Sequence, residues 1–240
     1  MILRWLIFFN ALPLCFSALP LCAAAVTGKV VLQDSRDRTV IRRADFSGVV
    51  VSLRPVAGAP PAAIHGTHAK ILQKDKTFAP HLLAIQEGTY VDFPNSDPIF
   101  HNAFSSYNGQ IFDIGLYPPG TSRSVRFARE GAVRVFCNIH AAMSAVIVVL
   151  ATPYFAVSQM DGSFAIASVP PGDYELRVFH ERSTEATLRG LARKITVSGE
   201  TSVVPTLAIS EAGYLPVPHK NKYGQEYEPD FRDVYSPARK

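Results

Sequence analysis

Residues 132–150, AVRVFCNIHAAMSAVIVVL, decide the fold. Two apolar runs of strand length flank a short loop in this stretch. In the first run Val133, Val135 and Cys137 fall on one face, because successive side chains of a strand point to opposite sides. The stretch therefore predicts two core strands joined by a loop that begins at Cys137.

The chain from Val26 onward carries the same kind of signal, with short apolar or alternating runs separated by turns rich in Pro, Gly, Asn and Asp. Only Thr184–Arg193 could hold a short helix. Regularly spaced strands of this kind indicate an all-β sandwich class. We expect strands at Lys29–Leu32, Gly48–Leu53, Thr89–Phe93, Ser124–Phe127, Ala132–Cys137, Ala145–Leu150, Ser163–Ile166, Tyr174–Phe179 and Lys194–Val197.

The first 25 residues have the composition of an export signal. Arg4 precedes an apolar stretch that ends in three alanines, a small-residue cleavage pattern. Two prolines and an asparagine interrupt that stretch, which argues against the alternative of an uncleaved membrane anchor. We expect a signal peptide over residues 1–25, a periplasmic mature protein, and no stable membrane insertion after cleavage.

Cleavage would leave Cys137 as the single cysteine, because Cys15 and Cys22 lie in the leader. In an oxidising compartment a lone thiol is a liability unless it is buried or bound to a metal. The formal net charge of +4 falls by one with the loss of Arg4, and no basic run is interleaved with aromatic residues. The sequence therefore predicts no nucleic-acid partner.

The loop 137–143, CNIHAAM, offers a thiolate, an imidazole and a thioether at C-x2-H-x2-M spacing. Soft sulfur ligands favour Cu(I), imidazole suits both oxidation states, and two histidines, a cysteine and a weak axial methionine form the blue-copper arrangement. The second histidine must come from elsewhere, and His101 lies at a loop-to-strand boundary upstream. Each residue alone could be structural. Together, His101, Cys137, His140 and Met143 predict a copper site.

These residues resemble the cupredoxin family over roughly Ala69–Leu150, and the spacing of the loop is similar to that of the short ligand loop of amicyanins. The resemblance implies one type 1 copper ion with Met143 as axial ligand and the two histidines and Cys137 as equatorial ligands. It also implies that Asn102 fastens the two ligand loops to each other. Ala141 and Ala142 stand where amicyanin-like loops often carry proline.

Residues 93–105, FPNSDPIFHNAFS, also resemble exported plastocyanin-like proteins described as methylamine utilisation proteins. The two resemblances imply a periplasmic electron carrier, not an enzyme, that passes single electrons between redox partner proteins. One alternative is a copper-binding or copper-delivery protein without rapid electron transfer. Another is a structural β-sandwich interaction protein in which Cys137 is merely buried.

An Asp-Gly turn at Asp161 and a Pro-Pro-Gly turn at Pro170 join the later strands. Over residues 152–210 this pattern resembles the carboxypeptidase regulatory-like, transthyretin-like sandwich, which implies a fold and no reaction. We expect a signal peptide at 1–25, a cupredoxin-like Greek-key sandwich at 26–151 that includes the N-terminal strands, a smaller transthyretin-like β-sandwich at 152–210, and an extended polar tail at 211–240, lying on the surface or free. The sequence leaves open the alternative that the N-terminal strands Val26–Val56 belong to the second sandwich.

The remaining histidines carry weaker signals. His65 and His68 lie in an expected loop, and His81 precedes an apolar strand, so we expect His81 to be structural or to lie beside the metal site. His180 and His219 have no ligand-like neighbours in the sequence, which predicts surface positions for both.

Overall fold

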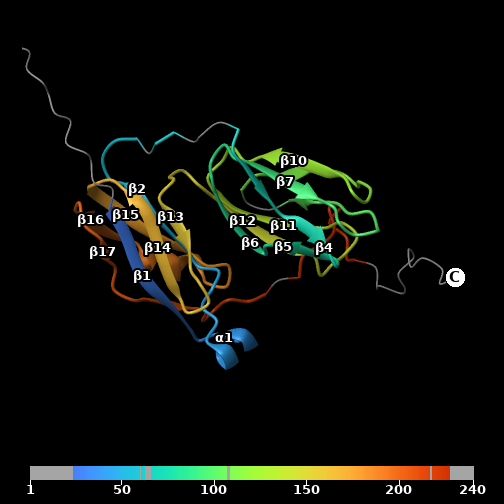
Figure 1. The fold of residues 1–240 in the computed structure, drawn as a ribbon. Helices are drawn as coiled ribbons and strands as arrows, with labels where there is room; N and C mark the ends of the chain where they lie inside the picture. Colours follow the sequence, from blue (N-terminus) through green and yellow to red (C-terminus); the bar gives the residue numbers. More distant parts are fainter. Residues whose placement is uncertain (1–23, 60, 63–65, 107–108, 217, 228–240) are drawn as a thin grey trace, which may run out of the picture.

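The computed structural model describes residues 24–59, 61–62, 66–106, 109–216 and 218–227. Over these residues the secondary structure is strands and two short helices, α1 (Arg38–Arg43) and α2 (Glu185–Leu191), which confirms the all-β prediction. Neither helix is long and apolar enough to cross a membrane. Figure 1 shows two β bodies side by side, here called the central sandwich (68–150) and the flanking sandwich (24–55 and 155–210).

The strands of the central sandwich are β3 (His68–Lys70), β4 (Leu72–Lys74), β5 (Thr77–Ala79), β6 (Leu82–Gln86), β7 (Tyr90–Pro94), β8 (Phe104–Ser105), β9 (Phe112–Asp113), β10 (Ser122–Arg126), β11 (Gly131–Phe136) and β12 (Ser144–Leu150). One sheet has the order β10-β7-β3, the other has the order β6-β12-β11-β8-β9, and β4 and β5 form a hairpin. Phe93, Phe127, Val133 and Ile147 are fully buried in the core of this sandwich. Cys137 belongs to the same core, as the alternation in its strand predicts.

Strand β12 is buried on both faces, which explains why its sequence is continuously apolar instead of alternating. Ile147 and Val149 pack into the core of the central sandwich. Val146 and Val148 point the other way, into a separate apolar cluster with Val50 of the flanking sandwich. The two sandwiches therefore share a hydrophobic interface.

The strands of the flanking sandwich are β1 (Ala24–Gln33), β2 (Val50–Pro55), β13 (Phe155–Val157), β14 (Ser163–Val169), β15 (Gly172–Phe179), β16 (Arg193–Val197), β17 (Ser202–Val203) and β18 (Leu207–Ser210). One sheet runs β14-β1-β17, with β18 also paired to β1, and the other runs β13-β2-β15-β16. Val51, Leu53, Phe164 and Leu176 belong to the core of this sandwich.

The structure divides the chain differently from the layout expected at 26–151 and 152–210. Strand β1 pairs with β14, β17 and β18, and β2 lies between β13 and β15, so both N-terminal strands belong to the flanking sandwich. The physical reason is packing, because Val51 and Leu53 of β2 bury their side chains in the core that Phe164 and Leu176 also line. The central sandwich is therefore inserted between β2 and β13. The expected leader lies outside the described residues, except for Ala24 and Ala25 at the start of β1.

The turn before β14 depends on Gly162, which has φ +80°. A Cβ atom there would collide with the carbonyl oxygen of Val30. We expect Gly162→Ala to lower the free energy of unfolding by about 2–4 kcal/mol through left-handed strain plus overpacking. Gly48 has the same φ of +80° and open space around its missing Cβ, so Gly48→Ala is the control for backbone strain alone, at about 1–2 kcal/mol. Equal losses in urea unfolding would contradict a role for the Val30 contact.

An ion pair crosses the interface between the sandwiches. His81, just before β6, places Nε2 2.9 Å from the Glu181 carboxylate, just after β15, while its Nδ1 lies 3.1 Å from the Ser144 carbonyl oxygen. His81 is thus a structural residue, as expected.

His180 is buried, with Nε2 2.9 Å from Glu211 Oε1, so the prediction of a surface position for His180 is wrong.

The His81–Glu181 pair makes stability depend on pH. The hydrogen bond to the Glu181 carboxylate raises the pKa of His81 above 6.5 despite the opposing effect of burial. Burial raises the pKa of Glu181, but the bond from His81 and the charges of His81, Arg182 and His180 together outweigh it, so that pKa lies below 4.5. The pair therefore stabilises the fold fully between pH 4.5 and pH 6.5, the ordinary pKa values of Glu and His. This stabilisation is lost as pH rises through the folded-state pKa of His81.

We expect His81→Gln to lower the free energy of unfolding at pH 5.5 by less than about 1 kcal/mol, because half of the His81 side chain is exposed. The deficit relative to the parent protein should shrink at pH 8.5, where His81 in the parent is losing its charge. Urea unfolding of both proteins at the two pH values measures this. A deficit of the same size at both would count against the ion pair.

Candidate metal centre

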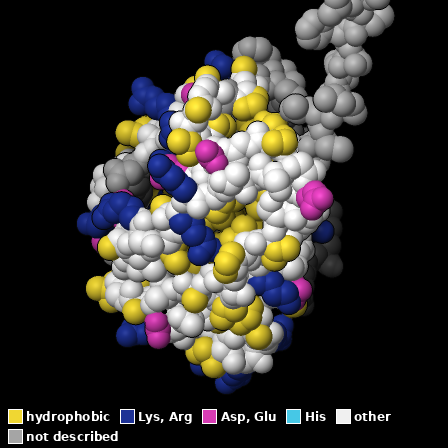
Figure 2. All heavy atoms as spheres, turned by 90° about the vertical axis from the view of Figure 1, so that its left-hand side faces the viewer, with side chains coloured by type: hydrophobic (Ala, Val, Ile, Leu, Met, Phe, Trp, Pro, Cys, Tyr) yellow, Lys and Arg dark blue, Asp and Glu magenta, His cyan; other side chains and the backbone are white. Residues whose placement is uncertain are grey.

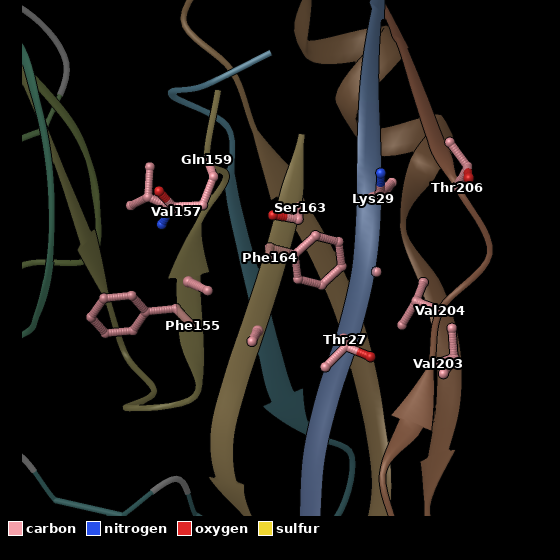
Figure 3. A pocket seen from close by; sticks show the side chains of 13 residues that line it. Thr27, Lys29, Phe155, Val157, Gln159, Ser163, Phe164, Val203, Val204 and Thr206 are labelled. Atoms are coloured by element: carbon pink, nitrogen blue, oxygen red, sulfur yellow. The ribbon is translucent and has the colours of Figure 1, made fainter. Parts of the chain in front are cut away.

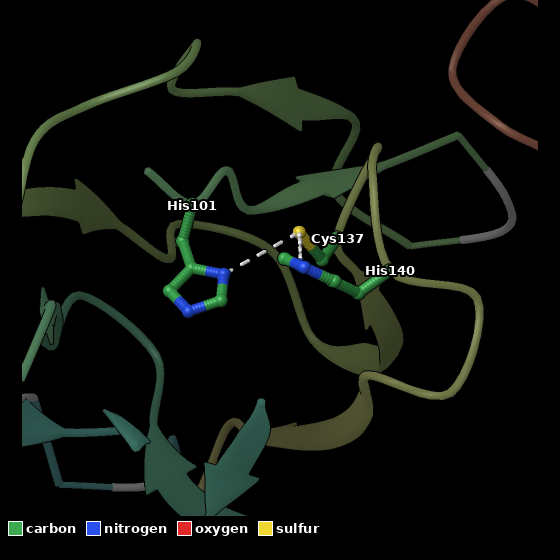
Figure 4. A group of neighbouring side chains, drawn as sticks. All are labelled: His101, Cys137 and His140. Atoms are coloured by element: carbon green, nitrogen blue, oxygen red, sulfur yellow. Dashed lines mark hydrogen bonds between the residues drawn. The ribbon is translucent and has the colours of Figure 1, made fainter. Parts of the chain in front are cut away.

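Three side chains meet at one end of the central sandwich, as Figure 4 shows: His101, Cys137 and His140. Their ligand atoms all lie within 4.8 Å of one another. The Cys137 Sγ is 3.9 Å from His101 Nδ1 and 3.6 Å from His140 Nδ1. The structure thus brings together three of the four residues expected to bind copper.

The spacing of these atoms suits a metal ion. With bonds of about 2.3 Å to a thiolate and about 2.0 Å to an imidazole, sulfur and nitrogen in a trigonal plane lie about 3.7 Å apart. The two measured distances, 3.9 and 3.6 Å, bracket that value. Two imidazoles with one thiolate are the equatorial donors of a blue-copper site, so the residues present fit a copper ion.

Strand β11 ends at Phe136 and places Cys137 in the core, and a tight loop follows. The Met143 amide donates to the His140 carbonyl oxygen at 3.1 Å, and the Cys137 amide donates to the Met143 carbonyl oxygen at 3.3 Å. These two bonds close the loop on itself, so that His140 lies beside Cys137. The chain then enters β12.

Met143 is fully buried in the same apolar cluster as Cys137. A buried thioether suits an axial copper ligand, and it equally suits a residue that fills a gap in a core. The assignment of Met143 as a ligand therefore stays a prediction.

His101 is fully buried and is held from two sides. Its backbone forms a β-bridge with Tyr117, with the Tyr117 amide donating to the His101 carbonyl oxygen at 2.9 Å. Its Nε2 donates to Asp97 Oδ2 at 2.7 Å. This bond fixes the proton on Nε2, so Nδ1 is left with a free lone pair on the side of Cys137.

Asp97 is the residue that sequence reasoning missed, and its only signal is a carboxylate four positions before a candidate ligand. Its carboxylate also accepts hydrogen bonds from the amides of Asp75 and Lys76, at 2.6 and 2.9 Å. Burial raises the pKa of Asp97, but the bonds from Lys76, His101 and Asp75 outweigh it and hold that pKa below its ordinary value. An ionised carboxylate behind a histidine ligand orients the ring and makes it more basic.

Asn102 links the two ligand segments, as the resemblance implied. Its Oδ1 accepts from the Asn138 amide at 3.2 Å, and its Nδ2 donates to Asp113 Oδ1 at 2.7 Å. The loop after Cys137 is thereby tied to the residue after His101.

Burial raises the pKa of the Cys137 thiol, against the lowering effect of the backbone amides of Ile139, Asn102 and His140. Desolvation makes the thiolate costly when it is alone. The anionic form therefore requires a neighbouring positive charge, which a bound metal ion would supply.

The two histidines differ in exposure. His101 is sealed in the interior, whereas His140 is half-buried and is followed by exposed Ala141 and Ala142. Phe100 and Ile139 are each 44% exposed in the two segments that carry the histidines. The two segments that carry the histidines therefore expose large apolar side chains.

The C-terminal segment also reaches this end of the molecule. His219 was expected at the surface without a role, but its Nε2 lies 2.8 Å from the Ala141 carbonyl oxygen, and its ring stacks on Phe136. The expected tail therefore lies on the ligand loop over its described residues 218–227. Residues 228–240 lie outside the described part of the chain.

A groove of about 890 Å³ lies on the flanking sandwich, and none of the proposed ligands lines it. Figure 2 shows hydrophobic side chains near the middle of this side of the molecule with Lys and Arg among them, and Figure 3 shows Phe155, Phe164 and Val203 along the groove. The Phe164 ring crosses β1 at Gly28, where a Cβ would lie 2.7 Å from its Cζ. Among the described residues, Lys29 is the only charged one that lines the groove, and the described lining supplies no acid, base or ligand set.

No protein-family model and no curated protein matches this chain. Similar solved structures include a purple cupredoxin from Nitrosopumilus maritimus, with 24% identity and a TM-score of 0.31, covering 34% of this chain and 99% of that one. A copper-containing nitrite reductase from Thermus scotoductus SA-01 has 21% identity and a TM-score of 0.34, covering 50% of this chain and 28% of that one. A reduced amicyanin variant has 14% identity and a TM-score of 0.34, covering 42% of this chain and 98% of that one.

Proposed function

We propose that this protein binds one copper ion through His101, Cys137 and His140, with Met143 as axial ligand, and carries single electrons. The observation that supports this most is the buried His-Cys-His group at one end of the central sandwich, with spacing that suits a trigonal metal. Copper, when bound, would supply a one-electron couple between Cu(I) and Cu(II).

The residues around the centre suit a carrier. Cys137 and His101 have no exposed surface, and Asp97 and Asn102 fix the segments that bear them. A ligand set held by a β-sandwich has little freedom to rearrange between oxidation states, which favours fast electron transfer over ligand exchange. Copper delivery, the alternative, would require these buried ligands to be replaced during transfer to another protein.

The half-buried edge of His140 is the proposed electron port. The exposed apolar residues of the two segments that carry the histidines, Phe100 and Ile139, suit brief docking by redox partner proteins, because transient contacts of this kind are small. The signal peptide predicted at residues 1–25 and the likeness of residues 93–105 to exported methylamine utilisation proteins support a periplasmic location. The transthyretin-like resemblance of the flanking sandwich supports an accessory role for that body.

Reconstitution of the mature protein with Cu(II) tests the proposal. We expect an intense thiolate-to-copper absorption band in the visible region and a reversible one-electron reduction. A protein that retains copper without this band would support the delivery alternative. A protein that binds no copper would support a structural role for the sandwich and overturn the proposal.

The axial role of Met143 has its own test. We expect Met143→Leu to raise the reduction potential, because the cupric state loses a donor, while the free energy of unfolding falls by less than about 1.5 kcal/mol. Met160→Leu is the matched control, since Met160 is 63% exposed on the flanking sandwich. Voltammetry that gives the same potential for both variants would make Met143 a packing residue only.

A further inference from the structure

After β18 the chain leaves the flanking sandwich and runs to the far end of the central sandwich, drawn in orange to red in Figure 1. We call residues 218–227 the strap. We propose that the strap positions the ligand loop 137–143 through His219, Lys222 and Tyr227, none of which is a ligand. This inference rests on the proposed function in that the loop is taken to bind copper.

The strap bonds to the backbone at both ends of the ligand loop. The Tyr227 hydroxyl donates to the Cys137 carbonyl oxygen at 2.8 Å. His219 Nε2 donates to the Ala141 carbonyl oxygen, also at 2.8 Å. In the described part of the chain the loop has two internal backbone bonds, the bond from Asn138 to Asn102 and no proline, so the bonds from the strap further restrict its motion.

The strap also bonds to the residues that link the two ligand segments. The Lys222 amide donates to Asn138 Oδ1 at 3.0 Å, and Lys222 Nζ donates to Asp113 Oδ2 at 2.8 Å. The other oxygen of Asp113 accepts from Asn102, which follows His101. The strap therefore connects to the segments of both histidines and of Cys137.

Packing completes the contact. The His219 ring stacks on Phe136, the residue before Cys137, with 3.9 Å between centroids and 22° between planes, and Tyr227 meets His219 edge-on at 5.1 Å. Asn221 Oδ1 accepts from the amides of Tyr223 and Gln225, which folds the strap into a turn of its own. The strap is thus an ordered element with a fixed place on the loop.

Because the strap residues act through the loop, they are positioning residues. Outer partners of metal ligands change metal affinity about 10–100-fold when they are removed. The strap bonds to the carbonyl oxygen of Cys137 itself. Loss of this bond should therefore let the position of the thiolate vary and so change the charge-transfer band.

The test compares Tyr227→Phe, which removes one hydroxyl, with Tyr223→Phe in the full chain. The Tyr223 ring is 69% exposed and lies under the Lys222 ammonium, a ring contact that phenylalanine retains. We expect Tyr227→Phe to speed amide hydrogen exchange of residues 137–143 in the metal-free protein and to speed copper release from the loaded protein about tenfold, with a shifted visible band. Tyr223→Phe should leave all three unchanged.

A second pair of variants keeps the test decisive if Tyr227→Phe fails to fold by circular dichroism. His219→Ala removes the donor to Ala141, and His219→Gln restores an amide donor, so the glutamine variant should recover part of the slow exchange and slow release. Unchanged exchange in Tyr227→Phe and His219→Ala would overturn the proposal. Faster exchange with the same spectrum and release rate would also overturn it, because the strap would then be structural only. If the parent binds no copper, the proposed function fails while the exchange measurement still tests the strap.

Discussion

Replacement of Cys137 by serine is expected to abolish the visible band and to weaken copper binding by more than about 100-fold. This loss of affinity exceeds the one expected when a residue that only contacts a metal ligand is replaced. The reason is that the thiolate supplies both the charge-transfer bond and the only negative charge among the three clustered ligands. The fold should persist, at a cost of about 1–3 kcal/mol for a buried hydroxyl. Absorption and circular dichroism, measured on the same samples, check both parts.

Cys137→Ala serves as the companion variant, because it removes the sulfur without burying a hydroxyl. If both variants lose the band, the thiolate is its source and the polarity of serine is irrelevant. A serine protein that keeps its colour would show that the assigned ligand set is wrong.

Loss of the two imidazoles is expected to have unequal consequences. His101→Ala and His140→Ala should both lower copper affinity strongly, but added imidazole should restore the site only in the His140 variant. His140 is half-buried beside exposed alanines, so a free imidazole can reach its place, whereas His101 has no exposed surface. Copper titrations with and without imidazole measure the difference.

The two histidine variants control for each other, because each removes the same group from the same donor set. Equal rescue would contradict the difference in access between the two positions. Unchanged copper affinity in His101→Ala would show that His101 is not a ligand. His81 could then take its place only by breaking its ion pair with Glu181.

The ligand loop could be predicted because its chemistry is local in the sequence. Cys137, His140 and Met143 lie within one short segment, and the alternation of Val133 and Val135 directs Cys137 inward. His101 required a partner from another segment. It could be proposed because it stands where an apolar strand begins, and the structure places it beside Cys137.

The division into two bodies could not be predicted in the same way. Strand β2 is a short run whose first four residues are all buried, and nothing in its sequence identifies its neighbours, which are β13 near Phe155 and β15 near Leu176. Helix α1 was missed because six residues are too few for a periodic signal, although Asp37 caps it through the Thr39 amide.

The burial of His180 and the contacts of His219 were missed for a related reason. The partner of His180 is Glu211, and those of His219 are Phe136 and Ala141, which are distant in sequence. A segment that attaches through single hydrogen bonds and ring contacts shows no hydrophobic period, so its sequence is indistinguishable from that of a free tail.

The insertion of one sandwich into the other has a consequence for biosynthesis. Strands β1 and β2 leave the ribosome before β13–β18 exist, and about a hundred residues separate β2 from its neighbour β13, which is about 5–20 s of translation. The inserted body, which is contiguous in the chain, can close during that interval. Phe155 pairs with Ser52, so the two chain segments that flank the inserted body lie side by side, and a compact inserted body makes the loop closed by the late pairing of β2 with β13 effectively shorter than its length in residues. The order of synthesis thus makes the inserted body a template on which the surrounding one is completed.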